Sequence, residues 1–223
     1  MALYTVADLH LSFSTEKPMD VFGDRWKDHP QKIAERWNLT DDDTVVLPGD
    51  LSWAIDFKEL AADMAFLDAL PGKKIVAKGN HDYWWETMAK MTKFAENYPS
   101  VCFLHNNAYT VGDVSVCGTR GWTLENGDED EKVLNREVGR LRASLQKAEK
   151  EPLVFLHYPP VFGDLKCDPI LDVMKEFGVR ECYYGHLHGP GAASLAVQGE
   201  TDGVTYRLIS ADYLDFTPLK IRD

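Results

Sequence analysis

The chain has 223 residues and a formal net charge of −12, because 36 acidic side chains outnumber 24 basic ones. This excess of negative charge argues against broad electrostatic binding to extended nucleic acid or to an anionic membrane surface. It does not exclude a small anionic substrate, because bound divalent cations can reverse the charge locally. The hydrophobic share of 44% is that of a globular protein, and the length suits one domain over residues 1–223.

The cysteines and the apolar runs bear on the cellular compartment. Four cysteines occur without the C-x-x-C spacing of a zinc site, namely Cys102, Cys117, Cys167 and Cys182, and we expect reduced, buried thiols. Residues 1–13 lack the basic region and long apolar stretch of a secretory signal, and no apolar run is long enough to span a membrane. We therefore predict a cytoplasmic protein without a membrane contact, and nothing in the sequence implies a protein partner.

Apolar runs rich in β-branched and aromatic residues alternate with helical patterns along the chain. Strands are expected at 3–8, 44–49, 73–79, 101–105, 109–112, 114–118, 153–157, 181–185, 193–197 and 204–210, and helices at 30–37, 57–70, 87–98, 132–150 and 170–178. The alternation predicts a mixed α/β fold, in which the strands of the final third are mostly antiparallel. The acidic segment 127–131 is expected to be a solvated loop that precedes the long helix.

Potential metal ligands stand at the ends of five of the predicted strands. They are Asp8 and His10, then Asp50, then Asn80 with His81 and Asp82, then His157, and finally His186 and His188. Each group alone is more often an ordinary turn or a buried histidine than a ligand. Five of the seven histidines nevertheless fall in these places, and ligands gather at the carboxyl ends of strands in α/β sheets. We therefore expect these strand ends to converge on one shared site.

In this order the residues resemble the signature of the calcineurin-like metallophosphoesterase superfamily. The matching blocks are Asp8-Leu9-His10, Gly49-Asp50, Gly79-Asn80-His81-Asp82, His157 and Gly185-His186-Leu187-His188. The segments KPMDVFGDRW (17–26), PGDLSWAID (48–56) and GNHDYWW (79–85) look like a bacterial subgroup of small predicted phosphohydrolases. The resemblance implies a four-layer fold, in which two mixed β-sheets pack as a sandwich that is flanked by α-helices.

The resemblance also implies two divalent metal ions, which would be manganese, iron or zinc. By position, Asp8, His10 and His188 would hold the first metal, Asn80, His157 and His186 the second, and Asp50 would bridge the two. The catalytic residues would be Asp50 and His81, while Asp82 would support the loop. The implied reaction is phosphoester hydrolysis, in which a hydroxide held between the metals attacks phosphorus and His81 assists the leaving group.

The second block departs from that of the protein serine/threonine phosphatases. Trp53 stands where those enzymes have an aspartate that orients the catalytic histidine, and Ala54 stands where they have a phosphate-binding arginine. A methyl group cannot replace a bidentate guanidinium, so protein phosphatase activity is not expected. Arg120, which follows the strand at 114–118, is a candidate replacement. The alternative for Arg120 is a surface ion pair with the acidic segment 125–131.

Aromatic side chains crowd the same strand ends. We predict that Trp53, Trp84 and Trp122 form an apolar wall for the leaving group, such as a nucleobase or an aryl ring. The alternative is that they pack to seal the ends of the sheets. The aromatic residues and the missing arginine favour a small phosphodiester as the substrate. The alternatives are a phosphomonoesterase or pyrophosphohydrolase with the same site, and a non-catalytic scaffold with the same fold.

Overall fold

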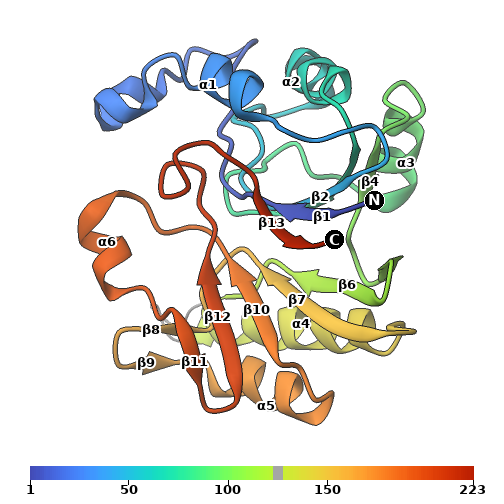
Figure 1. Ribbon diagram of the computed structural model, residues 1–223, viewed down its shortest axis with the longest axis vertical. Helices are drawn as coiled ribbons and strands as arrows, with labels where there is room; N and C mark the ends of the chain where they lie inside the picture. Colours follow the sequence, from blue (N-terminus) through green and yellow to red (C-terminus); the bar gives the residue numbers. More distant parts are fainter. Residues whose placement is uncertain (123–127) are drawn as a thin grey trace.

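The computed structural model describes the backbone of residues 1–122 and 128–223, and the side chains of all of these except 128–130. Two mixed sheets form its centre (Figure 1). The first has the order β13 (Leu219–Arg222), β1 (Leu3–Thr5), β2 (Thr44–Pro48), β3 (Lys73–Ala77), β4 (Val101–Phe103). The second has the order β11 (Gly199–Thr201), β12 (Val204–Leu208), β10 (Glu181–Tyr184), β7 (Glu151–Leu156), β6 (Val114–Thr119), β5 (Tyr109–Val111). A separate hairpin joins β8 (Val161–Phe162) to β9 (Leu165–Lys166).

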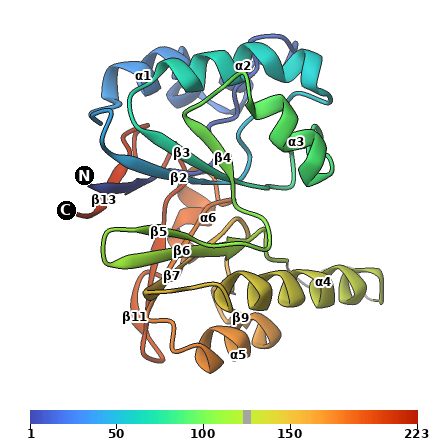
Figure 2. The ribbon, with the colours of Figure 1, turned by 90° about the vertical axis from the view of Figure 1, so that its right-hand side faces the viewer.

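Helices cover the outer face of each sheet, which gives the four layers that the sequence predicts (Figure 2). The first sheet is covered by α1 (His29–Arg36), α2 (Phe57–Ala69) and α3 (Met88–Ala95), and the second by α4 (Asp128–Leu145) and α5 (Asp168–Glu176). The short helices η1 (Met19–Phe22), η2 (Asp24–Trp26) and α6 (Gly189–Leu195) lie in connections. Among the described residues, no helix is both long enough and apolar enough to cross a lipid bilayer.

Three apolar cores hold the four layers together. In β2, Val45 and Leu47 face the helices, while Val46 faces the second sheet. Between the sheets, Phe155 of β7 stacks on Tyr183 of β10 with ring centroids 5.1 Å apart. Because inner strands of a covered parallel sheet are buried on both faces, they read as continuous apolar runs and not as alternating ones. This burial explains why these strands are readily recognised in the sequence.

The final third of the chain differs from the prediction of mostly antiparallel strands. β10 pairs in parallel with β7 on one side and with β12 on the other. The antiparallel neighbour in this part of the sheet is β11, which pairs with β12. Helices α5 and α6 lie in the two connections, and a helical crossover is the usual link between parallel strands. The strand predicted at 193–197 is also wrong, because α6 runs to Leu195. A five-residue apolar run does not by itself distinguish a strand from a short helix.

The acidic segment 127–131 also differs from its prediction as a solvated loop. Residues 128–131 belong to the first turn of α4, and residue 127 lies outside the described residues. Acidic side chains are stabilising at the N-terminus of a helix because of the helix dipole. The negative charge therefore suits the start of the helix as well as it suits a loop. The four cysteines are free thiols, and Cys117 and Cys182 are buried.

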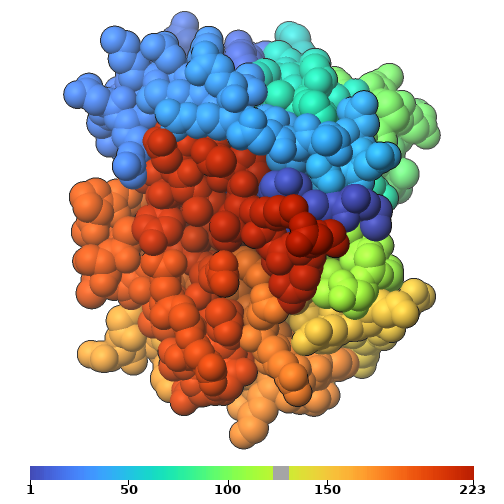
Figure 3. All heavy atoms as spheres, viewed as in Figure 1, coloured from blue at the N-terminus to red at the C-terminus, as the bar shows by residue number. Residues whose placement is uncertain are grey.

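The end of the chain closes one side of the sandwich. β13 pairs antiparallel with β1, and Leu3 lies opposite Arg222. The guanidinium of Arg222 forms an ion pair with Glu181 of β10, which belongs to the other sheet. On this face the C-terminal residues, in red, lie between the N-terminal residues in blue and the orange part of the chain (Figure 3). The last strand thus ties the two sheets to each other.

Candidate active site

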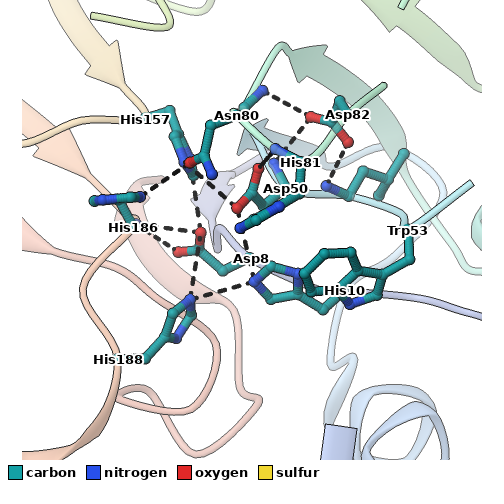
Figure 4. A network of polar contacts seen from close by, with 12 residues as sticks. Asp8, His10, Asp50, Trp53, Asn80, His81, Asp82, His157, His186 and His188 are labelled. Atoms are coloured by element: carbon teal, nitrogen blue, oxygen red, sulfur yellow. Dashed lines mark hydrogen bonds and ion pairs between the residues drawn. The ribbon is translucent and has the colours of Figure 1, made fainter. Parts of the chain in front are cut away.

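Loops from both sheets meet at one end of the sandwich (Figure 4). From the first sheet, Asp8 and His10 follow β1, Asp50 follows β2, and Asn80 to Asp82 follow β3; from the second sheet, His157 follows β7, and His186 and His188 follow β10. Figure 4 shows these side chains directed toward one another across a small volume. The structure therefore brings together all of the residues that the sequence predicts as metal ligands.

Glycines at the start of the blocks allow this close approach. A Cβ atom added to Gly79 would lie 2.1 Å from Asp50 Oδ1, and one added to Gly185 would lie 2.4 Å from Asp8 Oδ2. Gly49 adopts φ +99°, and its Cβ would lie 2.6 Å from Gly79 Cα. No other residue type fits these three positions, because real Cβ atoms do not approach other heavy atoms so closely. Glycine is therefore required where the loops cross.

Several of the candidate ligands have a strained backbone. Asp8, His10, Asp50 and His186 adopt φ values of 61°, 46°, 51° and 70°. The left-handed region costs a non-glycine residue roughly 1–2 kcal/mol. Such residues cluster at functional sites, where the surrounding structure holds them in place. These backbone conformations are unfavourable by themselves, and they direct the four side chains into one volume.

The first group of side chains surrounds His10. Its Nε2 atom lies 3.3 Å from Nε2 of His188 and 3.8 Å from Asp50 Oδ2. Asp8 Oδ1 lies 3.9 Å from His188 Nε2, so that Asp8, His10 and His188 offer three ligand atoms to one point. Nδ1 of His10 is buried without a hydrogen-bond partner among the described residues.

The second group surrounds the side-chain oxygen of Asn80. This Oδ1 atom lies 2.6 Å from His157 Nε2 and 3.0 Å from His186 Nδ1. Oδ2 of Asp50 lies 3.5 Å from His157 Nε2 as well as close to His10 in the first group. Asp50 therefore contacts both groups, as a bridging ligand must. Asp8 also reaches both, because its Oδ1 atom lies 3.6 Å from His157 Nδ1 and 3.9 Å from His188 Nε2.

Electrostatics in this volume favour bound cations. Burial, followed by the charges of Asp82 and Asp8, raises the pKa of Asp50 to about 9, and burial raises the pKa of Asp8 to about 6. Burial lowers the pKa of His10 and of His157 well below the usual value, so both imidazoles are neutral at pH 7. Neutral imidazoles and clustered carboxylates are the ligands that divalent transition metals use. The donor set thus fits metal ions.

Asp82 holds two of the loops together. Its Oδ2 atom accepts hydrogen bonds from the backbone N–H of Asp50 at 2.9 Å and of Gly79 at 2.7 Å. Its Oδ1 atom accepts from the N–H of Leu51 at 2.9 Å and from the indole of Trp84 at 3.1 Å. The loop after β2 is thereby fixed to the loop after β3, which sets the position of the Asp50 carboxylate.

Asp212 is a functional candidate that the sequence reasoning missed. Its Oδ1 atom lies 2.8 Å from His188 Nδ1, and its Oδ2 atom accepts from the N–H of Gly189 at 3.0 Å. Burial acts to lower the pKa of His188, but the hydrogen bond to Asp212 together with the charges of Asp8 and Asp212 raises it overall. This contact leaves Nε2 of His188 free for a metal. The available signal was that Asp212, too, follows an apolar strand, β12.

His81 lies over the two groups of ligands without joining either. Its backbone N–H donates to Asp50 Oδ1 at 2.8 Å, and its ring centroid lies 4.3 Å from that of Trp53. Trp53 in turn stacks on His10 at 5.1 Å. These three residues line a cavity of about 830 Å³, together with Asp50, His186 and His188. The cavity is large enough to place a phosphoester against the candidate ligands.

The other predicted substrate-binding residues do not line this cavity in the described part of the chain. Trp84 is only 1% exposed and packs in the core beneath Asp82. The guanidinium of Arg120 packs 4.5 Å from the ring of Trp122 and 3.6 Å from the buried carboxylate of Glu137. The ion pair that the sequence suggested for Arg120 was with the acidic segment 125–131, of which the side chains of 125–130 lie outside the described residues. Among the described side chains, the acidic partner of Arg120 is Glu137.

Comparison with known proteins identifies relatives at the level of family and fold. A family model described as calcineurin-like phosphoesterase matches residues 1–190. The chain has no match among curated proteins. A protein of unknown function from Aquifex aeolicus has a similar structure, with a TM-score of 0.57 and 16% identity over 98% of this chain and 95% of that one. The phosphopantetheinyl hydrolase of Mycobacterium tuberculosis is similar with a TM-score of 0.56 and 14% identity, over 99% and 95% of the two chains.

The contact between Asp212 and His188 yields a prediction for metal binding. Replacing Asp212 with Asn removes the charge that orients His188, and we expect manganese affinity to fall by about 10- to 100-fold. Calorimetric titration with manganese measures this change. Asp215→Asn is the matched control, because Asp215 is an exposed carboxylate three residues away whose ion pair is with Arg36. Unchanged affinity in Asp212→Asn would show that Asp212 does not support a metal ligand.

Proposed function

Because the chain belongs to the calcineurin-like phosphoesterase family and is a metal-dependent phosphoesterase, we propose that its substrate is a small organic phosphodiester. One observation carries the proposal: Asp50 stands between two groups of metal-ligand atoms on the floor of a cavity that His81 overhangs. One protein of similar structure, the phosphopantetheinyl hydrolase of Mycobacterium tuberculosis, is named as a hydrolase, which is in keeping with hydrolysis here.

The ligand atoms support a pair of divalent cations. Asp8, His10 and His188 would hold one, Asn80, His157 and His186 the other, and Asp50 would contact both. When bound, such cations supply an activated water molecule and neutralise charge on the phosphate. A mixed set of imidazole, carboxylate and amide ligands suits manganese, iron or zinc. The strained loops and the hydrogen bonds to Asp82 hold the ligands ready, so that little reorganisation accompanies binding.

His81 is proposed to assist the departing oxygen. The Tyr83 hydroxyl lies 3.4 Å from His81 Nδ1, and with Tyr83 donating, the ring proton stands on Nε2. Burial, followed by the charges of His188 and Lys17, lowers the pKa of His81, so the free imidazole is neutral at pH 7. An anionic phosphate beside the ring favours its protonated form. His81 can thus donate a hydrogen bond, or a proton, to the leaving group.

The charge of the cavity favours a diester over a monoester. Among the described residues that line it, Arg25 is the one arginine, and its Nη1 atom already donates to the carbonyl oxygen of Asp212 at 2.7 Å. Arg120, the predicted substitute for the absent clamp, is engaged with Glu137 and Trp122. A phosphomonoester carries a second negative charge on its phosphate, and the cavity has no unengaged arginine among its described lining residues to balance that charge. A phosphomonoesterase or a pyrophosphohydrolase with the same ligands is the alternative.

The remaining features of the proposal concern the setting of the enzyme. The net charge of −12 supports a small substrate in place of extended nucleic acid or a membrane surface. We propose a cytoplasmic location and a single domain over residues 1–223. A non-catalytic scaffold is the third candidate, and the full set of ligands together with His81 weighs against it.

The substrate preference can be tested with two matched aryl esters. In the presence of manganese, we expect kcat/KM for bis(p-nitrophenyl) phosphate to exceed that for p-nitrophenyl phosphate by at least about tenfold, which corresponds to about 1.4 kcal/mol of transition-state stabilisation. Release of p-nitrophenolate measures both rates. The reverse order would establish the monoesterase alternative. Metal binding without hydrolysis of any phosphoester would leave only the scaffold.

The role of His81 gives a second prediction. His81→Ala should retain the metals and lose about 10²- to 10⁴-fold in kcat for a diester with a phenol leaving group, but much less for one with p-nitrophenol. The reason is that a basic leaving group needs the donated proton most. His105→Ala is the control, because His105 is a half-buried histidine that does not line the cavity. An equal loss with both leaving groups would rule out proton donation by His81.

A further inference from the structure

We infer that the wall of the cavity above the candidate metal ligands binds a large apolar group, so that the substrate is a phosphodiester with an extended hydrocarbon part and not a nucleotide. This inference rests on the proposed function and specifies its substrate class. It is carried by the residues that form the wall, by the hydrogen bonds that these residues already make, and by the exposed side chains at the rim.

The cavity is divided between a polar floor and an apolar wall. The floor consists of His10, Asp50, His81, His186 and His188, which belong to the site described above. The apolar side chains of the wall are Met19, Phe22 and Trp26 from one segment and Pro190 and Ala193 of α6 from another. The rest of the lining consists of Arg25, Trp53, Gly189, Asp212 and Tyr213. At about 830 Å³ the cavity far exceeds the space that a phosphate needs. Most of its volume is therefore available to the organic part of the ester.

Several polar atoms on the wall are already bonded to the protein. Nε1 of Trp53 donates to Sδ of Met19 at 3.2 Å. Both carboxylate oxygens of Asp212 accept hydrogen bonds, from His188 and Gly189. The hydroxyl of Tyr213 accepts from Gln198 at 2.8 Å. Arg25 also lines the cavity and keeps N–H groups beyond the one that donates to Asp212. A sugar or a nucleobase placed here would lose its hydrogen bonds to water and find few replacements besides these N–H groups, whereas a hydrocarbon loses none.

Exposed apolar side chains continue the wall outward. Phe22, which lines the cavity, is 69% exposed, and its neighbour Val21 is 71% exposed. Exposed apolar surface next to a pocket is typical of a site for an apolar ligand. A chain that is too long for the cavity can therefore extend along this rim.

The inference can be tested with a series of p-nitrophenyl alkyl phosphates. The leaving group is constant, while the alkyl group is methyl, hexyl or decyl. We expect kcat/KM to rise by roughly threefold per methylene while the chain enters the cavity, or about two orders of magnitude from methyl to hexyl. The p-nitrophenyl ester of thymidine 5′-phosphate should be hydrolysed more slowly than the decyl ester. Rates within threefold across the alkyl series, or preference for the thymidine ester, would overturn the inference.

Two variants locate the effect on the wall. Phe22→Ala should reduce the ratio of the decyl rate to the methyl rate by about fivefold, because part of the apolar wall is removed. Leu165→Ala is the matched control, because Leu165 is 73% exposed on β9 and does not line the cavity. Its ratio should equal that of the unaltered protein. An unchanged ratio in Phe22→Ala would mean that the chain does not bind at this wall.

A binding measurement separates this inference from the proposed function. Calorimetry of the manganese-loaded protein with methyl-, hexyl- and decylphosphonate should show affinity that rises with chain length and a negative heat-capacity change. This result would support the apolar site even if no ester were hydrolysed, in which case only the proposed reaction would fail. Equal affinity for the three phosphonates would overturn the inference, even if the methyl ester proved to be a good substrate.

Discussion

The carboxyl groups of Asp8, Asp50 and Asp82 are buried together where the strand-end loops meet, and burial raises the pKa of each of them. Gathering three carboxylates away from water is unfavourable unless positive charge compensates for them. The imidazoles around them provide little, because burial keeps His10 and His157 neutral. A pair of divalent cations, as we propose, would resolve this imbalance.

The sandwich supplies the rigidity that such an arrangement needs. Three apolar cores fix the strands, and the ligands stand where those strands end. Glycines let the loops cross, and Asp82 joins the loop after β2 to the loop after β3 through backbone N–H groups. The positive φ angles at Asp8, His10 and Asp50 are tolerated because these contacts hold the backbone on both sides.

The sequence was most informative where a single physical rule determined the outcome. Long apolar runs gave the inner strands, because only covered strands are apolar on both faces. The sequence blocks from Asp8 to His188 predicted one shared site, because residues that can bind metal stand at the ends of successive strands. It was least informative where packing in three dimensions decides. The first three residues of the run 193–197 are helical, because α6 ends at Leu195. Trp84 is buried beneath Asp82, and Arg120 packs against Glu137 of α4. Asp212 escaped notice because its partner His188 is 24 residues away.

The central claim is that the strand ends form one centre for two cations with Asp50 between them. Crystals grown with manganese, measured at an X-ray energy where manganese scatters anomalously, test this directly. The account predicts two anomalous peaks roughly 3.5–4 Å apart, one beside His10 and His188 and the other beside Asn80 and His157. A single peak, or manganese bound only away from Asp50, would contradict it.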